Sequence, residues 1–153
     1  MSEPKVLFKD HGNIAVIKLN RPEKRNALDP ETVMMFNEFS EKAKDPKFRA
    51  VIVTGDESAF CGGADITAAA SEDGMGWESV EQALNEGYHV GLNNLIYMDK
   101  VVIAAVEGAC AGIGCAYYLS SDITVMAKSS FFQIGFSKIA LIPDGGSNWL
   151  LTK

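Results

Sequence analysis

The chain has 153 residues, 47% of them hydrophobic, and a formal net charge of −6. It can therefore bury one core, and its acidic balance without a dense basic run argues against nucleic acid as a partner. No apolar run approaches the roughly 18 residues of a membrane span, and the first ten residues lack an apolar signal core, so we expect a cytoplasmic protein with no membrane partner. Because the three cysteines are odd in number and lack ligand spacing with either histidine, we expect reduced thiols and no metal site.

The first third of the chain predicts a β-hairpin followed by a helix and a strand. Apolar runs at 6–8 and 14–19 flank a turn-forming segment whose His11 we expect to be solvated. Asp29 and Pro30 are a favourable helix start, and the apolar spacing predicts an amphipathic helix over 30–44. The AVIVT run at 50–54 predicts a buried strand that leads into a glycine-containing turn.

The rest of the chain continues this alternation of helices and strands, which predicts an α/β domain. We expect a mobile loop over a pocket at 67–77 and a helix over 78–98, in which His89 is packed or on the surface. The run at 101–106 predicts a strand buried on both faces. The remaining predictions are a glycine turn, a helix over 112–120, a strand at 123–126, an extended or irregular segment at 131–136, and a helix over 144–152.

Two strands, ending at Thr54 and Val106, each lead into a glycine-rich turn. Such turns leave backbone N–H groups unpaired, which suits an anion or a carbonyl group that becomes anionic. Close packing of a helix on a sheet is the alternative explanation, and for glycine patterns taken alone it is the more common one.

Four segments together resemble the enoyl-CoA hydratase/isomerase family, also called the crotonase family: AFCGGADI, AAVEGACAGIG, Ser121-Asp122-Ile123 and IPDGG. The resemblance runs from about Val6 to the last residue. It implies an α/β, crotonase-like spiral core of repeated ββα units over residues 1–153, with the family's C-terminal helical region absent. For the full-length form it implies a homotrimer or hexamer.

The resemblance also implies a substrate and a site. The substrate is an acyl-CoA thioester, with coenzyme A as part of the substrate and no separate cofactor. The backbone N–H groups of Ala64 and Ile113 match the family's oxyanion hole, where an isoleucine is acceptable because only its main chain acts. By the same matching, the substrate pocket is formed by Gly63, Asp65, Ile66, Gly112, Gly114 and Phe136, and the CoA contacts are Lys24, Arg25 and Ala27.

The acidic residues distinguish between possible reactions. The two glutamates of the family's hydratases correspond to Ala116 and Phe136, neither of which transfers protons. Asp144 remains, at a turn where family isomerases place their acid. Because moving a double bond needs only one base, the resemblance favours an enoyl-CoA isomerase with Asp144 as the catalytic residue. A hydratase-like enzyme and a catalytically impaired CoA-thioester-binding module are the alternatives, and Asp144 could also be a plain turn residue or helix N-cap.

A nucleotide-binding oxidoreductase is a further alternative. Gly108, Gly112 and Gly114 resemble the glycine pattern of short-chain dehydrogenases, with Asp122 downstream. That pattern should follow the first strand and precede a Tyr-xxx-Lys motif, and here it does neither. A lone glycine pattern is a weak signal, so this alternative is disfavoured.

Overall fold

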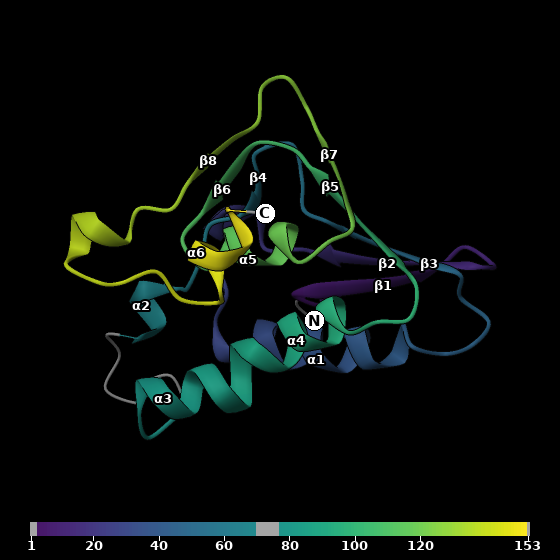
Figure 1. Ribbon diagram of the computed structural model, residues 1–153, viewed down its shortest axis with the longest axis horizontal. Coiled ribbons are helices and arrows are strands. Elements are labelled where there is room, and N and C mark those ends of the chain that lie inside the picture. The colour runs from purple at the N-terminus through teal and green to yellow at the C-terminus, as the bar shows by residue number, and fades with distance from the viewer. Residues whose placement is uncertain (1–2, 70–76, 153) are drawn as a thin grey trace.

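The computed structural model describes residues 3–69 and 77–152 (Figure 1). Its strands form two sheets, one with the order β1-β2-β3-β5-β7 and the other with the order β4-β6-β8. Only the β1–β2 hairpin is antiparallel, and the other strand pairs are parallel. The strands are β1 (Val6–Asp10), β2 (Ile14–Leu19), β3 (Ala50–Thr54), β4 (Ala59–Cys61), β5 (Val101–Val106), β6 (Ala109–Ala111), β7 (Ile123–Met126) and β8 (Phe131–Gln133).

From β3 onward, consecutive strands of the chain belong alternately to the larger and the smaller sheet. The chain places β3, β5 and β7 in the larger sheet, and each is followed by a strand of the smaller sheet: β4, β6 and β8. Helical segments follow each pair, so the repeating unit is strand, strand, helix, as a crotonase-like core requires. Stacking these units in parallel brings the turns that follow β4 and β6 to neighbouring positions.

Helices cover the larger sheet and fill the space between the two sheets. Figure 1 shows α1 beside α4, while α5 lies at the centre of the molecule, where residues 114–118 are buried. The helical segments are η1 (Pro22–Lys24), α1 (Pro30–Lys42), α2 (Ile66–Ala69), α3 (Val80–Gln82), η2 (Ala83–Tyr88), α4 (His89–Ile96), α5 (Gly114–Leu119), η3 (Phe136–Ile139) and α6 (Ser147–Leu150). Within the described residues no helix is long and apolar enough to span a membrane.

The start of α1 confirms the sequence prediction. The Asp29 carboxylate accepts hydrogen bonds from the Thr32 backbone N–H at 2.9 Å and the Thr32 hydroxyl at 2.6 Å, and Pro30 occupies the first helical position. The hairpin and the strands at 50–54, 101–106 and 123–126 are also confirmed. His11 is exposed and His89 is half-buried, as expected.

Other predictions need correction. Strand β5 is not buried on both faces: Val102, Ala104 and Val106 are buried, whereas Val101 is 44% exposed. The predicted helix over 78–98 contains a π-helical segment, η2, in which Gly87 lies against the indole of Trp77. The predicted helix over 144–152 begins only at Ser147, because Gly145 and Gly146 both have positive φ and delay it. Of the predicted loop at 67–77, residues 70–76 lie outside the described residues.

Candidate active site

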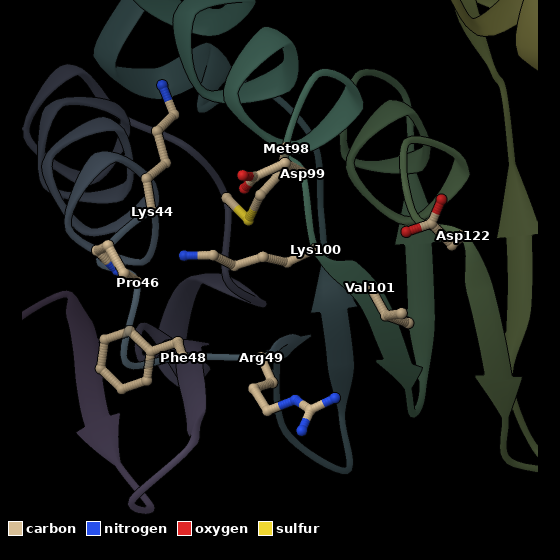
Figure 2. Close-up of a pocket in the computed structure, with 9 residues that line it drawn as sticks. All are labelled: Lys44, Pro46, Phe48, Arg49, Met98, Asp99, Lys100, Val101 and Asp122. Atoms are coloured by element: carbon tan, nitrogen blue, oxygen red, sulfur yellow. The ribbon is translucent and has the colours of Figure 1, made fainter.

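A hollow of about 700 Å³ lies where β3 and β5 begin, and it does not suit a substrate site (Figure 2). Ligands of open α/β sheets bind at the carboxyl ends of strands, and this hollow is at the opposite ends. Its most inward cation, Lys100, donates to the backbone carbonyl oxygens of Ala43 at 3.2 Å and Asp45 at 2.6 Å. Lys100 therefore stabilises the end of α1, and Lys44 at the same rim pairs with Glu41 at 2.6 Å.

A second pocket, of about 260 Å³, lies at the carboxyl ends of β4 and β6. Apolar groups and backbone dominate its wall, and within the described part of the chain Asp144 is its only ionisable lining residue. It is lined by Gly62, Gly63, Ala64, Ile66, Ala111, Gly112, Ile113, Gln133, Ile134, Gly135, Phe136, Ile139, Leu141 and Asp144. This pocket contains most of the residues that the sequence singled out.

Two glycines explain why the turns after β4 and β6 lie so close together. A Cβ atom built on Gly63 would lie 2.8 Å from the carbonyl oxygen of Ala111, and φ of Gly63 is +92°. A Cβ atom on Gly114 would lie 2.7 Å from both the carbonyl oxygen and the Sγ of Cys61. Any side chain at either position would push the two turns apart. Close packing, one of the two explanations considered for the glycines, therefore applies here.

The two backbone N–H groups singled out by the sequence have no acceptor among the residues that the structure describes. The parallel bridge between Leu28 and Ala64 is closed by the N–H groups of Leu28 and Asp65, and the neighbouring Gly112 N–H donates to the Gln133 carbonyl oxygen. Across residues 3–69 and 77–152, no hydrogen bond is made by the N–H of Ala64 or of Ile113. Both residues line the pocket, so each has a donor available to a ligand there.

Asp144 reaches the pocket from a turn between η3 and α6. Its backbone carbonyl oxygen accepts hydrogen bonds from the Ser147 N–H at 3.0 Å and the Ser147 hydroxyl at 2.7 Å. Its side-chain Oδ1 is buried and, among the residues the structure describes, has no hydrogen-bond partner. An unpartnered carboxylate oxygen in an apolar pocket favours the protonated form, and burial raises the pKa of Asp144 to about 6.

Two tyrosines lie near enough to Asp144 to interact with it electrostatically. Burial raises the pKa of Tyr88 and of Tyr117 well above the ordinary value, with Asp144 adding to both shifts. Both phenols are therefore neutral near pH 7. The Tyr88 hydroxyl donates to the Leu28 carbonyl oxygen at 3.3 Å, whereas the Tyr117 hydroxyl is buried without a hydrogen-bond partner in the described chain.

The two positions that correspond to hydratase glutamates carry no acid. Ala116 is fully buried on α5, and Phe136 lies with its ring tip about 4.0 Å from where a Gly112 Cβ would be. Phe136 lines the pocket as a predicted substrate-binding residue, and so do Gly63, Ile66 and Gly112. The site thus combines two available N–H donors with a single carboxylate.

Two residues predicted to bind substrate are not part of this pocket wall, and one alternative for Asp144 does not hold. Asp65 does not line the pocket: it pairs with Arg21 at 3.1 Å and accepts from the Thr67 N–H at 3.0 Å. Gly114 packs against Cys61 and is absent from the pocket wall. Asp144 is not a helix N-cap, because Gly146 holds that position before α6.

The residues that follow Asp144 do not open toward the pocket. Gly145 is packed closely against Ala116. Trp149 is 57% exposed and is not part of the pocket wall.

The predicted CoA segment is attached to the pocket through its backbone. The Gly62 N–H donates to the Arg25 carbonyl oxygen at 2.8 Å, and the Leu28 N–H donates to the Gly63 carbonyl oxygen at 2.8 Å. The side chains of Lys24 and Arg25 are exposed, and Ala27 is half-buried. The two cations are therefore free to meet a ligand that leaves the pocket on this side.

Sequence reasoning missed Asn26, the residue that holds this segment in place. Asn26 is fully buried at φ +55°, accepts from the Arg21 N–H at 2.7 Å, and donates to the Ala59 carbonyl oxygen at 2.7 Å and the Asp56 carboxylate at 2.9 Å. Its only signal in the sequence was an asparagine, a residue that tolerates positive φ, directly after two charged residues. Arg21, also missed, donates to the Ala27 carbonyl oxygen and pairs with both Asp29 and Asp65.

Comparisons with known proteins agree with this geometry. A family model described as Enoyl-CoA hydratase/isomerase matches residues 9–153. The chain is 35% identical over its whole length to a probable enoyl-CoA hydratase of Rhodobacter capsulatus, of which it spans 58%. It is 34% identical to the 1,2-epoxyphenylacetyl-CoA isomerase of Escherichia coli, with 92% of this chain and 54% of that protein covered.

Solved structures give the same result. The crystal structure of an enoyl-CoA hydratase from Polaromonas sp. JS666 matches with a TM-score of 0.82 at 34% identity, covering 95% of this chain and 57% of that one. The fold is therefore the mixed α/β fold of crotonases. The chain belongs to the enoyl-CoA hydratase/isomerase family, and it spans somewhat over half the length of the relatives it matches.

Proposed function

We propose that this protein is an enoyl-CoA isomerase, which shifts the double bond of an acyl-CoA thioester with Asp144 as its single proton-transferring residue. The observation that carries the proposal is the composition of the pocket. Its described wall holds two backbone N–H groups without protein acceptors and one ionisable residue, whose carboxylate has a buried oxygen without a hydrogen-bond partner. The names of the relatives include both hydratase and isomerase, so the reaction type rests on this composition.

The proposed reaction needs only these groups. Asp144 takes a proton from the carbon between the thioester carbonyl and the double bond, and charge gathers on the carbonyl oxygen as an enolate. The N–H groups of Ala64 and Ile113 stabilise that charge, each contributing roughly 3–4 kcal/mol by comparison with measured oxyanion holes. Asp144 then returns the proton to the far carbon of the former double bond, which completes the shift without added water.

A raised pKa suits this role. A carboxylic acid with a pKa of about 6 is mostly ionised at neutral pH and is a stronger base than an ordinary aspartate. The proposed CoA contacts are Lys24 and Arg25, near phosphate, and the Ala27 backbone, near adenine. Coenzyme A enters only as part of the substrate. A homotrimer or hexamer, a single crotonase-like domain and a cytoplasmic location are further proposals, and they rest on the sequence reasoning.

A CoA-thioester-binding module without turnover is the second candidate. It is favoured by the absence of any acid at Ala116 and Phe136. It predicts binding of several acyl-CoA thioesters with no change in the acyl group.

One spectroscopic comparison separates the candidates. An isomerase converts a 3-enoyl-CoA into the conjugated 2-enoyl thioester, so ultraviolet absorbance of the conjugated thioester should rise. A hydratase supplied with 2-enoyl-CoA would lower the same absorbance. Binding of both thioesters, seen by calorimetry, with neither absorbance change would reject the isomerase proposal and favour the binding module.

A further inference from the structure

Asp144 is followed by a glycine that lies directly on two helices. A Cβ atom built on Gly145 would be 2.7 Å from Ala116 Cβ, 3.2 Å from Ile113 Cγ1 and 3.3 Å from Leu92 Cδ1. Real Cβ atoms do not approach a neighbouring carbon as closely as 2.7 Å, and φ of Gly145 is +59°, which an L residue rarely adopts. The main chain beside Asp144 is thus in contact with α5 and α4.

Ala116 forms the other half of this contact. It is fully buried on α5, three residues after Ile113, so the two side chains share a face of the helix. A larger side chain at position 116 would need the space that Gly145 already occupies. Since position 145 cannot be made smaller than glycine, the distance between the turn and α5 depends on the size of residue 116.

The hydrogen bonds of the turn do not fix this distance. The hydrogen bonds from Ser147 close the turn onto α6, and the Leu141 N–H donates to the Phe136 carbonyl oxygen on the preceding side. These bonds shape the segment from within. The 145–116 contact is the tightest of those given for Gly145, and it joins the residue next to Asp144 to the helix that begins directly after Ile113, one of the two proposed oxyanion donors.

We propose that Ala116 is a positioning residue: its small side chain lets the turn at 143–146 lie against α5, and so holds the Asp144 carboxylate inside the pocket. The catalytic consequence rests on the proposed function, whereas the positioning itself does not. An alanine at this position is then not merely a missing acid. It is the condition for using a carboxylate that enters the pocket from the turn at 143–146.

The charged groups near Asp144 allow its titration to report its position. Tyr117 on α5 and Tyr88 on η2 remain neutral, since burial raises the pKa of both hydroxyls. Asp65, beside the pocket after β4, is held by Arg21, and Lys138 on η3 is exposed. Burial is the main cause that raises the pKa of Asp144, so a turn displaced toward solvent would let this pKa fall.

The test compares Ala116→Val with Ala43→Val. Ala43 is equally buried, at the end of α1 and outside the pocket wall, so its variant controls for overpacking in the core. Carbon-13 NMR of carboxyl-labelled aspartate, with the Asp144 signal assigned from Asp144→Asn, reports the pKa. The rate of 3-enoyl-CoA conversion reports catalysis, because misplacement of a catalytic group by about 1 Å can cost on the order of 100-fold in rate.

For Ala116→Val we expect the Asp144 pKa to fall by about half a unit or more, and kcat to fall by about 10- to 100-fold with KM changed less than about threefold. Ala43→Val should change neither the Asp144 pKa nor the kinetic constants. Ala116→Ser, which adds one atom, should give a smaller shift in the same direction and serves if the valine variant does not fold. An unchanged Asp144 titration in the serine and valine variants that fold would overturn the positioning role. A wild-type protein without isomerase activity would instead reject the proposed function, and the titration would still decide the positioning.

Discussion

At the scale of single residues, Asp144 is placed where an ionised carboxylate is least stable. Its Oδ1 is buried and, in the described chain, lacks a partner that would stabilise the charge. A carboxylate kept for stability would be paired, as Asp29 is with Lys5 at 2.7 Å. The pKa of Asp29 is lowered, as expected for a carboxylate that stabilises the fold. The pKa of Asp144 is raised, as expected for the proposed proton-transferring residue.

This difference predicts that Asp144 destabilises the folded protein at neutral pH. Burial raises its pKa to about 6 from an ordinary 3.8, so its contribution to stability is full below about pH 4 and is lost as the pH rises through 6. Asp144→Asn should therefore raise the free energy of unfolding at pH 7.5 by on the order of 1–2 kcal/mol, after allowance for partial exposure. Urea unfolding at pH 7.5 and pH 3.5 checks this, and an equal gain at both pH values would contradict it.

At the scale of elements, the sequence predicted those parts of the site that depend on local chain geometry. The strand at 101–106 and the glycines after it predicted a turn with unpaired N–H groups, and Ile113 has one. Strand β6 was missed because Ala-Cys-Ala between two glycines looks like part of a turn. It becomes a strand only by pairing with β4 and β8, partners about fifty and twenty residues away in the sequence.

Long-range contacts also explain the other misses. Pro143-Asp144 is a favourable helix start, yet the helix waits until Ser147, since Gly145 is held at positive φ against Ala116. Asn26 could not be recognised because its partners, Asp56 and Ala59, follow thirty residues later. The resemblance to a family suggested the proposed acid and the proposed donors. Only the fold shows what keeps them in place.

The buried Asn26 predicts a large loss on substitution. Asn26→Ala removes hydrogen bonds to Asp56, Ala59 and Arg21 and leaves buried polar groups unpaired, so unfolding free energy should fall by about 2–4 kcal/mol. Asn20→Ala is the matched control, because Asn20 makes one exposed bond to the Pro4 carbonyl oxygen and should lose under about 1 kcal/mol. Chemical denaturation measures both. Similar losses in the two variants would mean that Asn26 does not hold the segment.

The segment at 21–28 also carries the CoA prediction. Lys24 and Arg25 are exposed, and exposed ion pairs are weak, so Arg25→Ala should weaken acyl-CoA binding about tenfold or less, and removal of both cations somewhat more. Arg49→Ala, at the larger hollow near the start of β5, should leave the dissociation constant unchanged. Calorimetry with a CoA thioester measures the dissociation constants of these variants. A loss of affinity in Arg49→Ala alone would move the CoA site to that hollow.

At the scale of the whole molecule, two consecutive strands expose large apolar side chains to solvent. Strands β7 and β8 expose Val125 at 60%, Phe131 at 59%, Ile123 at 51% and Phe132 at 50%. Figure 1 shows both strands at the outer side of the molecule, away from α1 and α4. The chain spans 58% of the length of its Rhodobacter relative. Both proposed oxyanion donors and Asp144 lie within it.

This face predicts strong binding of a hydrophobic dye by the 153-residue chain. Exposed apolar side chains of this kind attract dyes and promote association. The double variant Val125→Thr/Phe131→Thr should lower anilinonaphthalene sulfonate fluorescence at least twofold while changing the melting temperature little, because surface substitutions of this kind stay within about 0.5 kcal/mol each. The double variant Met34→Thr/Val80→Thr, on exposed residues of α1 and α3, is the control. Equal dye binding in all three proteins would show that the β7–β8 face is not the dye site.

We propose that Asp144 alone moves the proton, and the turnover of 3-enoyl-CoA by Asp144→Asn tests this. Asparagine keeps the shape of the side chain and removes the base. We predict that kcat falls by about 10²–10⁴-fold, the usual share of general acid–base catalysis, while the dissociation constant of the thioester changes less than about threefold. A variant that still moves the double bond at a rate near that of the unaltered protein would show that another residue carries the proton.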